Sequence, residues 1–377
     1  MGYFIRNTGD GRTPKEHEAE IFKQYIRGVV FNTLMGKRGS GKSIIMDDKK
    51  FAGMGKGDTR AYHFVPQFMG SGIRGQNASY EGNEKSIKEF MTEIRVDEIG
   101  QAFRKKGKMT DLRTIINLRA EFKEQLANWF RTWTEYDIID ALTGYMYDGA
   151  SYIDGFSRDD ETGQIIVSGA ALKTPLVKGA GRCFRPDTTG TGFKNIVVPE
   201  ADTTNEALLK DMVAGDIMNT QLLDQLQEFA KTAGKYPIKP VRLKDGREYY
   251  ILMLHPSAAR ELRADERWEK RILANYQGCN SLENDPIATG AMGVWEKIII
   301  KEADYIPSIS NGTVTVARNL LLGADAAVMA YAQTLNYMEK KFDYDREMGV
   351  AADEIRGIKK LDFDGVDLNV AQVPCAI

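Results

Sequence analysis

The feature of this sequence that most constrains its fold is a long stretch with helical periodicity between Met109 and Tyr147. Apolar residues recur in it at steps of three and four: Leu112, Ile115, Ile116, Phe122, Leu126, Trp129, Phe130 and Trp133. Thr110 or Asp111 is placed to cap its start, and Gly144 offers a stop. At ~1.5 Å per residue, such a helix is on the order of 50 Å long, far beyond the mean for globular domains. We therefore expect it to lie along something equally extended.

A second elongated feature precedes this helix. The pattern TRAYHFVP from Thr59 predicts a strand, and IKEFMTEIRVDEI from Ile87 predicts another. The residues between them are rich in glycine, so the two strands together predict a long hairpin with a glycine-rich tip. Because such a hairpin cannot bury its own faces, we expect it to pack across a contact with another subunit.

The first 60 residues hold 12 Lys or Arg against 7 Asp or Glu and have few regularly spaced apolar positions. We interpret them as a mobile or extended basic arm. The whole chain, by contrast, has a formal net charge of -2, which gives no excess of one sign to attract nucleic acid or an anionic membrane. Neither a signal peptide nor a membrane-spanning stretch is recognisable, so we expect the protein to stay in the cytoplasm where it is made.

The segment from Gly36 to Ser43 fits the phosphate-binding loop pattern, in which backbone amides surround phosphates and a lysine, here Lys42, reaches their charge. A true loop of this kind is followed by a long helix packed on a parallel sheet. Ile44 to Phe51 predicts only about two turns of helix, and no apolar strand ends in a carboxylate suited to orient a metal ion. We therefore favour a segment of the basic arm and keep a nucleotide-binding protein as the alternative.

The second half of the chain predicts a mixed α/β region. A helix is predicted from Thr204 to Thr232, YYILMLHP from Tyr249 predicts a buried strand, and Pro256 begins a helix that runs to Gln277. Two further apolar strands follow in VWEKIIIKEADYIP and TVTVARNLLLGADAAVMAYAQ, and the second of them breaks at Gly323.

Two segments have weaker patterns. Tyr147 to Thr203 is rich in Gly, Asp and Ser and predicts an excursion that holds only short strands such as QIIVSG. The tail from Glu339 to Val373 alternates charged and apolar residues and predicts several short strands.

Few residues are suited to catalysis or metal binding. The only histidines are His17, His63 and His255, and the cysteines are Cys183, Cys279 and Cys375. The cysteines are too widely spaced for a disulfide framework or a zinc site. His255 stands between a buried strand and a helix, which favours a hydrogen-bonded structural histidine over a catalytic base. We predict no catalytic, cofactor-binding or metal-binding residue, and no enzyme.

Two other clusters also favour structural roles. The aromatic stripe of Trp129, Phe130 and Trp133 has no basic residue interleaved on its face of the helix, so we interpret it as core rather than a platform for stacking bases. The basic cluster from Arg104 to Lys108 is interpreted as a solvated approach to the long helix, with a face toward nucleic acid as the alternative.

The order of these parts resembles the Hong Kong 97-type fold of tailed-bacteriophage major capsid proteins, and the sequence resembles their N-four-type family. The segments that carry the resemblance are GKGDTRAYHFVPQFMGSGIRG, YEGNEKSI, IRVDEIGQAFRKKGKMTDLRT, MLHPSAARELRADERW, ATGAMGVWEKIIIKEADYIP and DREMGVAADEIRGIKKLDFDGVDLNV. They occur in order over roughly residues 50 to 375. The stretch from Asp148 to Asp202 is longer than the family needs, and the first 45 residues match nothing firmly.

The resemblance implies an α+β fold with the parts of that capsid fold. The expected divisions are an N-terminal arm at 1–58, an extended loop hairpin at 59–100, and a peripheral domain at 101–203 with a spine helix and an inserted loop region. An axial domain at 204–335 follows, and 336–377 supply closing strands of the peripheral domain.

The resemblance also implies a function as a major capsid protein that assembles through hexameric and pentameric capsomers into an icosahedral head around the phage genome. Portal and scaffolding proteins are the expected partners, with non-specific contact to packaged double-stranded DNA and none to a membrane. The expected location is the virion, after assembly in the host cytoplasm. Besides nucleotide binding through Gly36 to Ser43, an encapsulin-like compartment shell on the same fold remains an alternative, which the neighbouring genes would separate.

Overall fold

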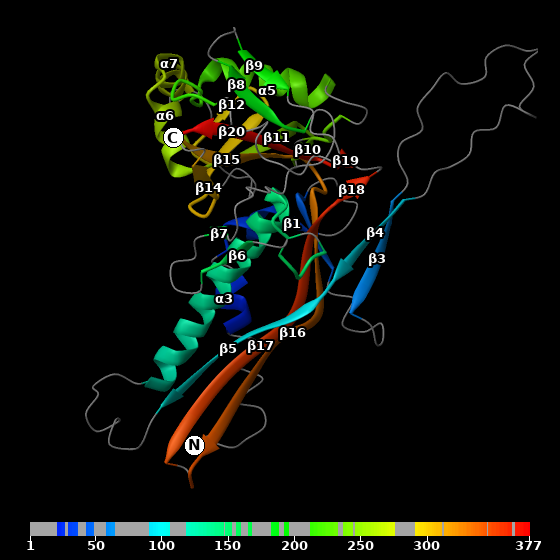
Figure 1. Cartoon of the computed structure of the whole chain (residues 1–377), viewed down its shortest axis with the longest axis vertical. Coiled ribbons are helices and arrows are strands. Elements are labelled where there is room, and N and C mark those ends of the chain that lie inside the picture. Colours follow the sequence, from blue (N-terminus) through cyan, green and yellow to red (C-terminus); the bar gives the residue numbers. More distant parts are fainter. Residues whose placement is uncertain are drawn as a thin grey trace, which may run out of the picture.

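The computed structural model describes residues 21–26, 29–36, 43–48, 58–64, 90–105, 118–146, 148–152, 156–159, 165–167, 182–187, 192–195, 212–232, 237–243, 246–275, 291–310, 313–344, 346–363 and 366–377. Figure 1 shows a broad region around a seven-stranded sheet and an elongated region in which helix α3 (Leu118–Thr143) lies beside long strands. Within the described ranges, no helix has both the length and the apolar character needed to cross a membrane.

The elongated region is built on a five-stranded sheet. In spatial order its strands are β1 (Met35–Gly36), β2 (Ile45–Asp48), β16 (Ala327–Phe342), β17 (Glu347–Lys360) and β5 (Asp97–Lys105). β16 and β17 are antiparallel and are 16 and 14 residues long. The short strands predicted for the tail are therefore wrong at this point, because β17 pairs with β16 along its length and its more and less buried residues alternate from Gly349 to Arg356.

Helix α3 packs along this sheet, as the periodicity predicts. Its fully buried apolar side chains in the main hydrophobic core include Leu126, Phe130, Ile138 and Leu142. The helix ends at Thr143, and Gly144 follows with a φ of 92°, in the left-handed region that favours glycine. The predicted stop is therefore confirmed, whereas the predicted start before Leu118 lies outside the described residues.

Part of the N-terminal segment packs on the same core. Residues 21–26 are helical, and a short 3-10 helix, η1 (Val30–Leu34), follows. The amide of Val30 donates to the Glu135 carboxylate on α3 at 2.9 Å. The buried apolar side chains of this N-terminal segment include Ile21, Tyr25, Val29, Phe31 and Leu34. A mobile or extended arm is therefore the wrong interpretation for these residues, because they supply side chains to the core.

The broad region contains the seven-stranded sheet. Its strands are β12 (Gly293–Trp295), β13 (Ile298–Glu302), β11 (Glu248–Leu254), β15 (Thr315–Leu322) and β14 (Ser308–Ser310), with β10 (Val241–Arg242) beside β11 and β20 (Val370–Ala376) beside β15. β11 is the buried strand predicted from YYILMLHP, which is thus confirmed. The predicted break at Gly323 is also confirmed, since β15 ends just before it and β16 begins in the other sheet.

The two faces of β11 join different cores. Leu252 and Leu254 pack with helices α5 (Thr220–Thr232), α6 (Pro256–Arg263) and α7 (Glu266–Asn275). Ile251 and Met253, on the opposite face, belong to the core that α3 and the N-terminal segment share. The sheet is therefore covered on both sides, and α3 connects the two regions.

Two helix predictions need correction. The described residues from 212 to 219 are not helical, so α5 begins at Thr220, where the Asn219 side chain accepts from the amide of Leu222 at 2.8 Å. The helix predicted to run from Pro256 to Gln277 is interrupted at Asp265. The Asp265 carboxylate accepts from the amide of Arg267 at 2.9 Å and caps α7, which explains the interruption.

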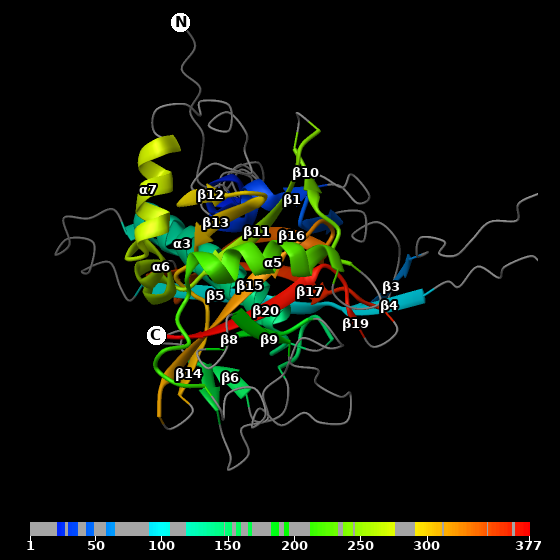
Figure 2. The same ribbon diagram turned by 90° about the horizontal axis from the view of Figure 1, so that it is seen from above.

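The predicted hairpin pairs as expected at its base. β3 (Thr59–Phe64) and β4 (Phe90–Arg95) are antiparallel, and Figure 2 shows them projecting to one side of the body. Its tip lies outside the described residues. Four further short strands form two small sheets in the predicted excursion: β6 (Phe156–Arg158) with β7 (Ile165–Val167), and β8 (Phe184–Asp187) with β9 (Gly192–Asn195). β18 (Asp362–Phe363) pairs with β19 (Val366–Asp367).

Candidate functional site

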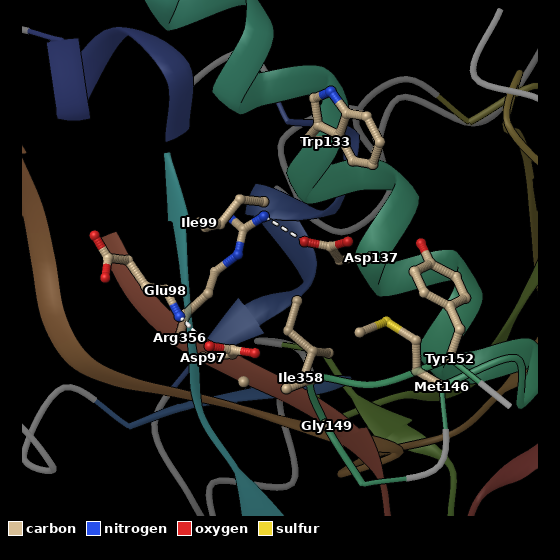
Figure 3. Close-up of a pocket in the computed structure, with 12 residues that line it drawn as sticks. Asp97, Glu98, Ile99, Trp133, Asp137, Met146, Gly149, Tyr152, Arg356 and Ile358 are labelled. Carbon is tan, nitrogen blue, oxygen red and sulfur yellow. Dashed lines mark hydrogen bonds and ion pairs between the residues drawn. The ribbon is translucent and has the colours of Figure 1, made fainter. Parts of the chain in front are cut away.

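A cluster of buried charged side chains joins α3 to β17. Figure 3 shows the guanidinium of Arg356, on β17, pointing toward Asp137 on α3, and the two form an ion pair at 2.5 Å. Arg356 also donates to Glu354 at 2.5 Å and to the hydroxyl of Thr134. Arg356 is therefore bonded to both elements, and its fork of N–H donors suits it to such a junction.

The local sequence explains why these residues meet. Glu354 and Arg356 are two residues apart on a strand, so their side chains leave the same face. Thr134 and Asp137 are three residues apart on a helix and share its inward side. The inward side of α3 packs on this face of β17, so Arg356 can bond both Thr134 and Asp137.

The cluster holds two carboxylates for one guanidinium. Burial raises the pKa of Glu354 and of Asp137, and the charge of Arg356 opposes this rise in both. Burial disfavours the charge of Arg356 itself, but Glu354 and Asp137 outweigh it and raise the pKa of the guanidinium. The group is therefore a buried structural ion network rather than a poised acid and base.

A second buried ion pair, Arg158 with Asp140, lies near the C-terminal end of α3. Arg158 of β6 donates twice to the Asp140 carboxylate, at 2.9 and 2.5 Å, and its guanidinium lies 4.0 Å from the ring centroid of Tyr136. The hydroxyl of Tyr152 donates to the same carboxylate at 2.9 Å. Burial raises the pKa of Asp140 despite Arg158. This pair attaches the excursion after α3 to the helix.

A pocket of about 180 Å³ lies beside the first cluster, between α3, β5 and β17 (Figure 3). Its lining residues are Asp97, Glu98, Ile99, Trp133, Asp137, Met146, Gly149, Ala150, Tyr152, Arg356, Gly357 and Ile358. The polar side chains that line it are carboxylates, the Tyr152 phenol, the Trp133 indole and Arg356, and no thiol, imidazole or aliphatic hydroxyl is among them. Two of these polar groups are already engaged, since Asp137 pairs with Arg356 and the Tyr152 hydroxyl donates to Asp140.

His255 has a structural place. Its Nδ1 accepts from the amide of Ser257 at 3.2 Å, so the histidine caps α6, and Pro256 stands in the first turn as predicted. Burial lowers the pKa of His255. The hydrogen-bonded structural histidine favoured from the sequence is confirmed.

The segment from Gly36 to Ser43 does not lead into a helix. Gly36 ends β1, and the chain continues after Ser43 into β2, which pairs parallel with both β1 and β16. The two helical turns predicted for Ile44 to Phe51 are therefore wrong for Ile45–Asp48. Lys42 lies outside the described residues. With a strand where a phosphate-binding helix should begin, the described residues around the motif do not support nucleotide binding.

The aromatic stripe and the basic cluster also have structural contacts. Phe130 is fully buried, Trp129 packs against the same core, and the Trp129 and Trp133 rings are 5.8 Å apart. The interpretation of the stripe as core is therefore confirmed for Phe130 and Trp129. In the basic cluster, Arg104 forms an ion pair with Glu347 at 2.5 Å and lies 4.3 Å from the Phe342 ring centroid. Residues 106–108 lie outside the described residues.

The base of the β3–β4 hairpin presents one buried and one exposed face. Tyr62, Thr92 and Ile94 are buried against the body, whereas Met91 is 55% exposed on the opposite face. An exposed apolar side chain on a projecting two-stranded sheet suits a contact with another molecule. This exposed face is the candidate interaction surface of the chain.

The sequence did not predict the ionic network. Its signal lies in EYDIID, where Asp137 and Asp140 fall on the side of the helix that its apolar residues bury. The partners Arg356 and Arg158 are far away in sequence, and only the fold brings them near. Among the described residues, no group of three or more His, Cys, Asp or Glu side chains could hold a metal ion.

The chain is similar to known proteins over almost its whole length. A family model described as phage capsid protein matches residues 7–373. The major capsid protein of Pseudomonas phage KPP25 is 26% identical over 376 residues, which cover 96% of this chain and 92% of that protein.

Solved structures give the same result for the fold. The capsid asymmetric unit of Cyanophage Pam1 is 20% identical with a TM-score of 0.68, covering 100% of this chain and 99% of that one. The capsid of Ralstonia phage GP4 is 20% identical with a TM-score of 0.66, covering 91% and 89%. The α+β capsid fold of the Hong Kong 97 type expected from the sequence is confirmed by these similarities.

Proposed function

Because this chain belongs to the phage capsid protein family and is a major capsid protein, a structural subunit of the virion shell, we propose how it assembles. Copies of the chain associate into hexameric and pentameric capsomers, and these close into an icosahedral head around the phage genome. Contacts of this kind join different surfaces of neighbouring copies, and symmetry closes them into rings and shells.

The observation that carries this proposal is the projecting hairpin. Its base is packed on the body through Tyr62 and Ile94, but Met91 on the other face is 55% exposed. A two-stranded sheet is at best marginally stable alone. In an assembled shell, a neighbouring copy of the chain would cover this exposed face.

The chain divides, in this proposal, as the sequence suggested except in its first part. Residues 59–100 form the loop hairpin, 101–203 the peripheral domain, 204–335 the axial domain, and 336–377 the closing strands, whereas the described residues of 1–58 pack on the main core and on the five-stranded sheet. The length of β16 and β17 beside α3 supports the grouping of most closing strands with the peripheral domain, while β20 adds to the seven-stranded sheet. The buried Arg356 cluster holds the spine helix on those strands.

The proposal assigns no catalytic activity to the chain. This is supported by the buried ionisable groups described above, which form ion pairs between elements: Arg356 with Asp137, and Arg158 with Asp140. Portal and scaffolding proteins are the proposed partners, with non-specific contact to packaged double-stranded DNA, and assembly takes place in the host cytoplasm. With a net charge of -2, contact with DNA would depend on local basic patches rather than on overall attraction.

The test is assembly of the purified chain. Expressed alone or with the scaffolding factor of its phage, it should form capsomers or closed shells in negative-stain microscopy, in a strongly concentration-dependent manner. Deletion of residues Met69 to Asn83 should leave a folded subunit that does not close shells. A second variant that replaces these residues with an equally long Gly-Ser segment separates the length of the hairpin from its side chains. A full-length protein that stays monomeric at high concentration with scaffold present would contradict the proposal.

A further inference from the structure

The hairpin changes partner at one residue. β4 pairs with β3 up to Arg95, and β5 pairs with β17 from Asp97 onward, so only Val96 lies between the two sheets. Figure 1 shows this as one continuous path from the projecting hairpin into the edge of the long sheet. The direction of the hairpin is therefore set by the backbone around Arg95 and Val96.

Two glycines from distant parts of the chain enclose this backbone. A β-carbon on Gly357 would overlap the carbonyl oxygen of Arg95, and one on Gly149 would lie 2.8 Å from the same oxygen. Gly149 also has a φ of 111°, which side-chain-bearing residues rarely adopt. The amide of Ile358 donates to the carbonyl of Gly149 at 2.9 Å, so the two glycine segments are bonded to each other.

Hydrogen bonds hold the enclosed backbone in place. The amide of Arg95 donates to the carbonyl of Asp148, and the amide of Val96 to the carbonyl of Asp58, both at 2.8 Å. The Asp148 carboxylate in turn accepts from the amides of Ala150 and Ser151, at 3.0 and 2.7 Å, and stabilises the turn that presents Gly149.

Side chains on both strands of the hairpin add to this attachment. Lys359 donates to the carbonyl of Glu93 at 2.9 Å, and Thr92 donates to the carbonyl of Asp362 at 3.1 Å. On β3, the hydroxyl of Tyr62 donates to Asp48 at 3.1 Å. Tyr62 and Ile94 also share a small apolar core with residues of β2, β16 and β17. The base of the hairpin is therefore bonded to the body from several sides.

We propose that Gly149 and Gly357 are positioning residues that fix the direction in which the hairpin leaves the subunit. A methyl group at Gly357 can be accommodated only if the Arg95 carbonyl moves away, and because Arg95 is the last residue of β4, that movement tilts the hairpin. Contacts within the single subunit thus set the direction of the hairpin before assembly. This inference rests on the proposed function only for the consequence that a tilted hairpin misses its neighbour.

The test compares Gly357→Ala with Gly323→Ala. Gly323 is a matched control, because its β-carbon would overlap a backbone carbonyl too, that of Lys239, but between β15 and β16 and not at the hairpin. Cysteines that replace the exposed His63 on β3 and Glu124 on α3 carry spin labels, with Cys279→Ser in every variant. The distance between the labels is measured in unassembled, full-length subunits, and shell formation is scored in parallel.

We expect Gly357→Ala to shift or broaden the label distance and to abolish closed shells, while Gly323→Ala keeps the wild-type distance. An unchanged distance in folded Gly357→Ala overturns the inference. A changed distance with normal shells supports the positioning role and contradicts the proposed hairpin contact, so the two failures can be told apart. If Gly357→Ala does not fold, Gly149→Ala carries the same test, with Gly246→Ala as its control. Gly246 also has a positive φ, of 75°, but open space where its β-carbon would lie.

Discussion

The hydroxyl of Tyr25 donates a hydrogen bond of 2.8 Å to the carboxylate of Glu354, which lies 329 residues further along the chain. Glu354 also accepts from Arg356, and Arg356 bonds Asp137 and Thr134 on α3. One buried network therefore joins the N-terminal segment, the long strand β17 and the spine helix. Buried networks of this kind are costly when broken, since a remaining partner is left without its hydrogen bond.

Tyr25→Phe should lower the free energy of unfolding of the subunit by about 1–3 kcal/mol, because it leaves one buried oxygen of Glu354 without its donor. Urea unfolding followed by circular dichroism measures this. Tyr344→Phe is the control, since Tyr344 is 99% exposed and its hydroxyl is in water. Equal stability of the two variants would contradict a role for the Tyr25 hydroxyl.

The network should also make stability depend on pH. Burial raises the pKa of Glu354 and of Asp137 in the folded state, so the folded chain binds protons more tightly than the unfolded chain does. Between the unfolded pKa of about 4 and the raised folded value, this contribution to stability is present at low pH and lost as pH rises. The charged and titratable groups around Glu354 are Arg356, Asp137, Tyr25 and Tyr331.

Glu354→Gln should remove part of this dependence. The difference between wild type and variant in the free energy of unfolding should change by up to about 1.4 kcal/mol per pH unit within that window, in favour of the variant as pH rises. Urea titrations from pH 4 to neutral pH measure it, and Glu98→Gln, at an exposed position on β5, is the control. Parallel curves for wild type and Glu354→Gln would show that the carboxylate does not titrate in this range.

Structural features that depend on a few neighbouring residues were predictable from the sequence, whereas features that depend on partners far away in the chain were not. The stop of α3 at Gly144, the pairing of β3 with β4, and the structural role of His255 each follow from a few neighbouring residues. Tyr25 was not assigned to the core, although Ile21 and Val29 lie one helical turn away on either side of it, because its partner Glu354 comes from the other end of the chain. The length of β17 was missed for a related reason, since it is stabilised by β16 and β5 on both sides.

The turn between β16 and β17 should be strained by Tyr344. This residue has a φ of 51°, in the left-handed region, where a bulky side chain is rare. Tyr344→Gly should therefore stabilise the isolated subunit by roughly 1 kcal/mol, while Tyr344→Ala, which removes the ring but keeps the β-carbon, should not. Thermal unfolding of the three proteins measures this. A Gly variant no more stable than the Ala variant would contradict backbone strain at this position.

Lys42→Ala should leave shell assembly intact. Ile44 leads into β2, so among the described residues the motif is followed by a strand and not by a helix whose N-terminus could bind a phosphate. Electron microscopy of the variant measures shell assembly, and titration of the wild type with Mg²⁺ and ATP measures nucleotide binding. Tight Mg²⁺-dependent ATP binding by the wild type that the variant loses would contradict it.

Met91→Asp should impair assembly without unfolding the subunit. Met91 is 55% exposed on β4, so its replacement should change the free energy of unfolding by no more than about 0.5 kcal/mol. In a shell, the same side chain would be covered by a neighbour, and a buried unpaired carboxylate there would oppose the contact. Met338→Asp is a matched control, because Met338 is 48% exposed but lies on β16 and not on the hairpin. Sedimentation of assembly reactions at equal concentrations should show a lower yield of shells for Met91→Asp than for Met338→Asp. Equal yields would mean that the exposed face of the hairpin makes no contact of its own, and that any loss reflects added charge alone.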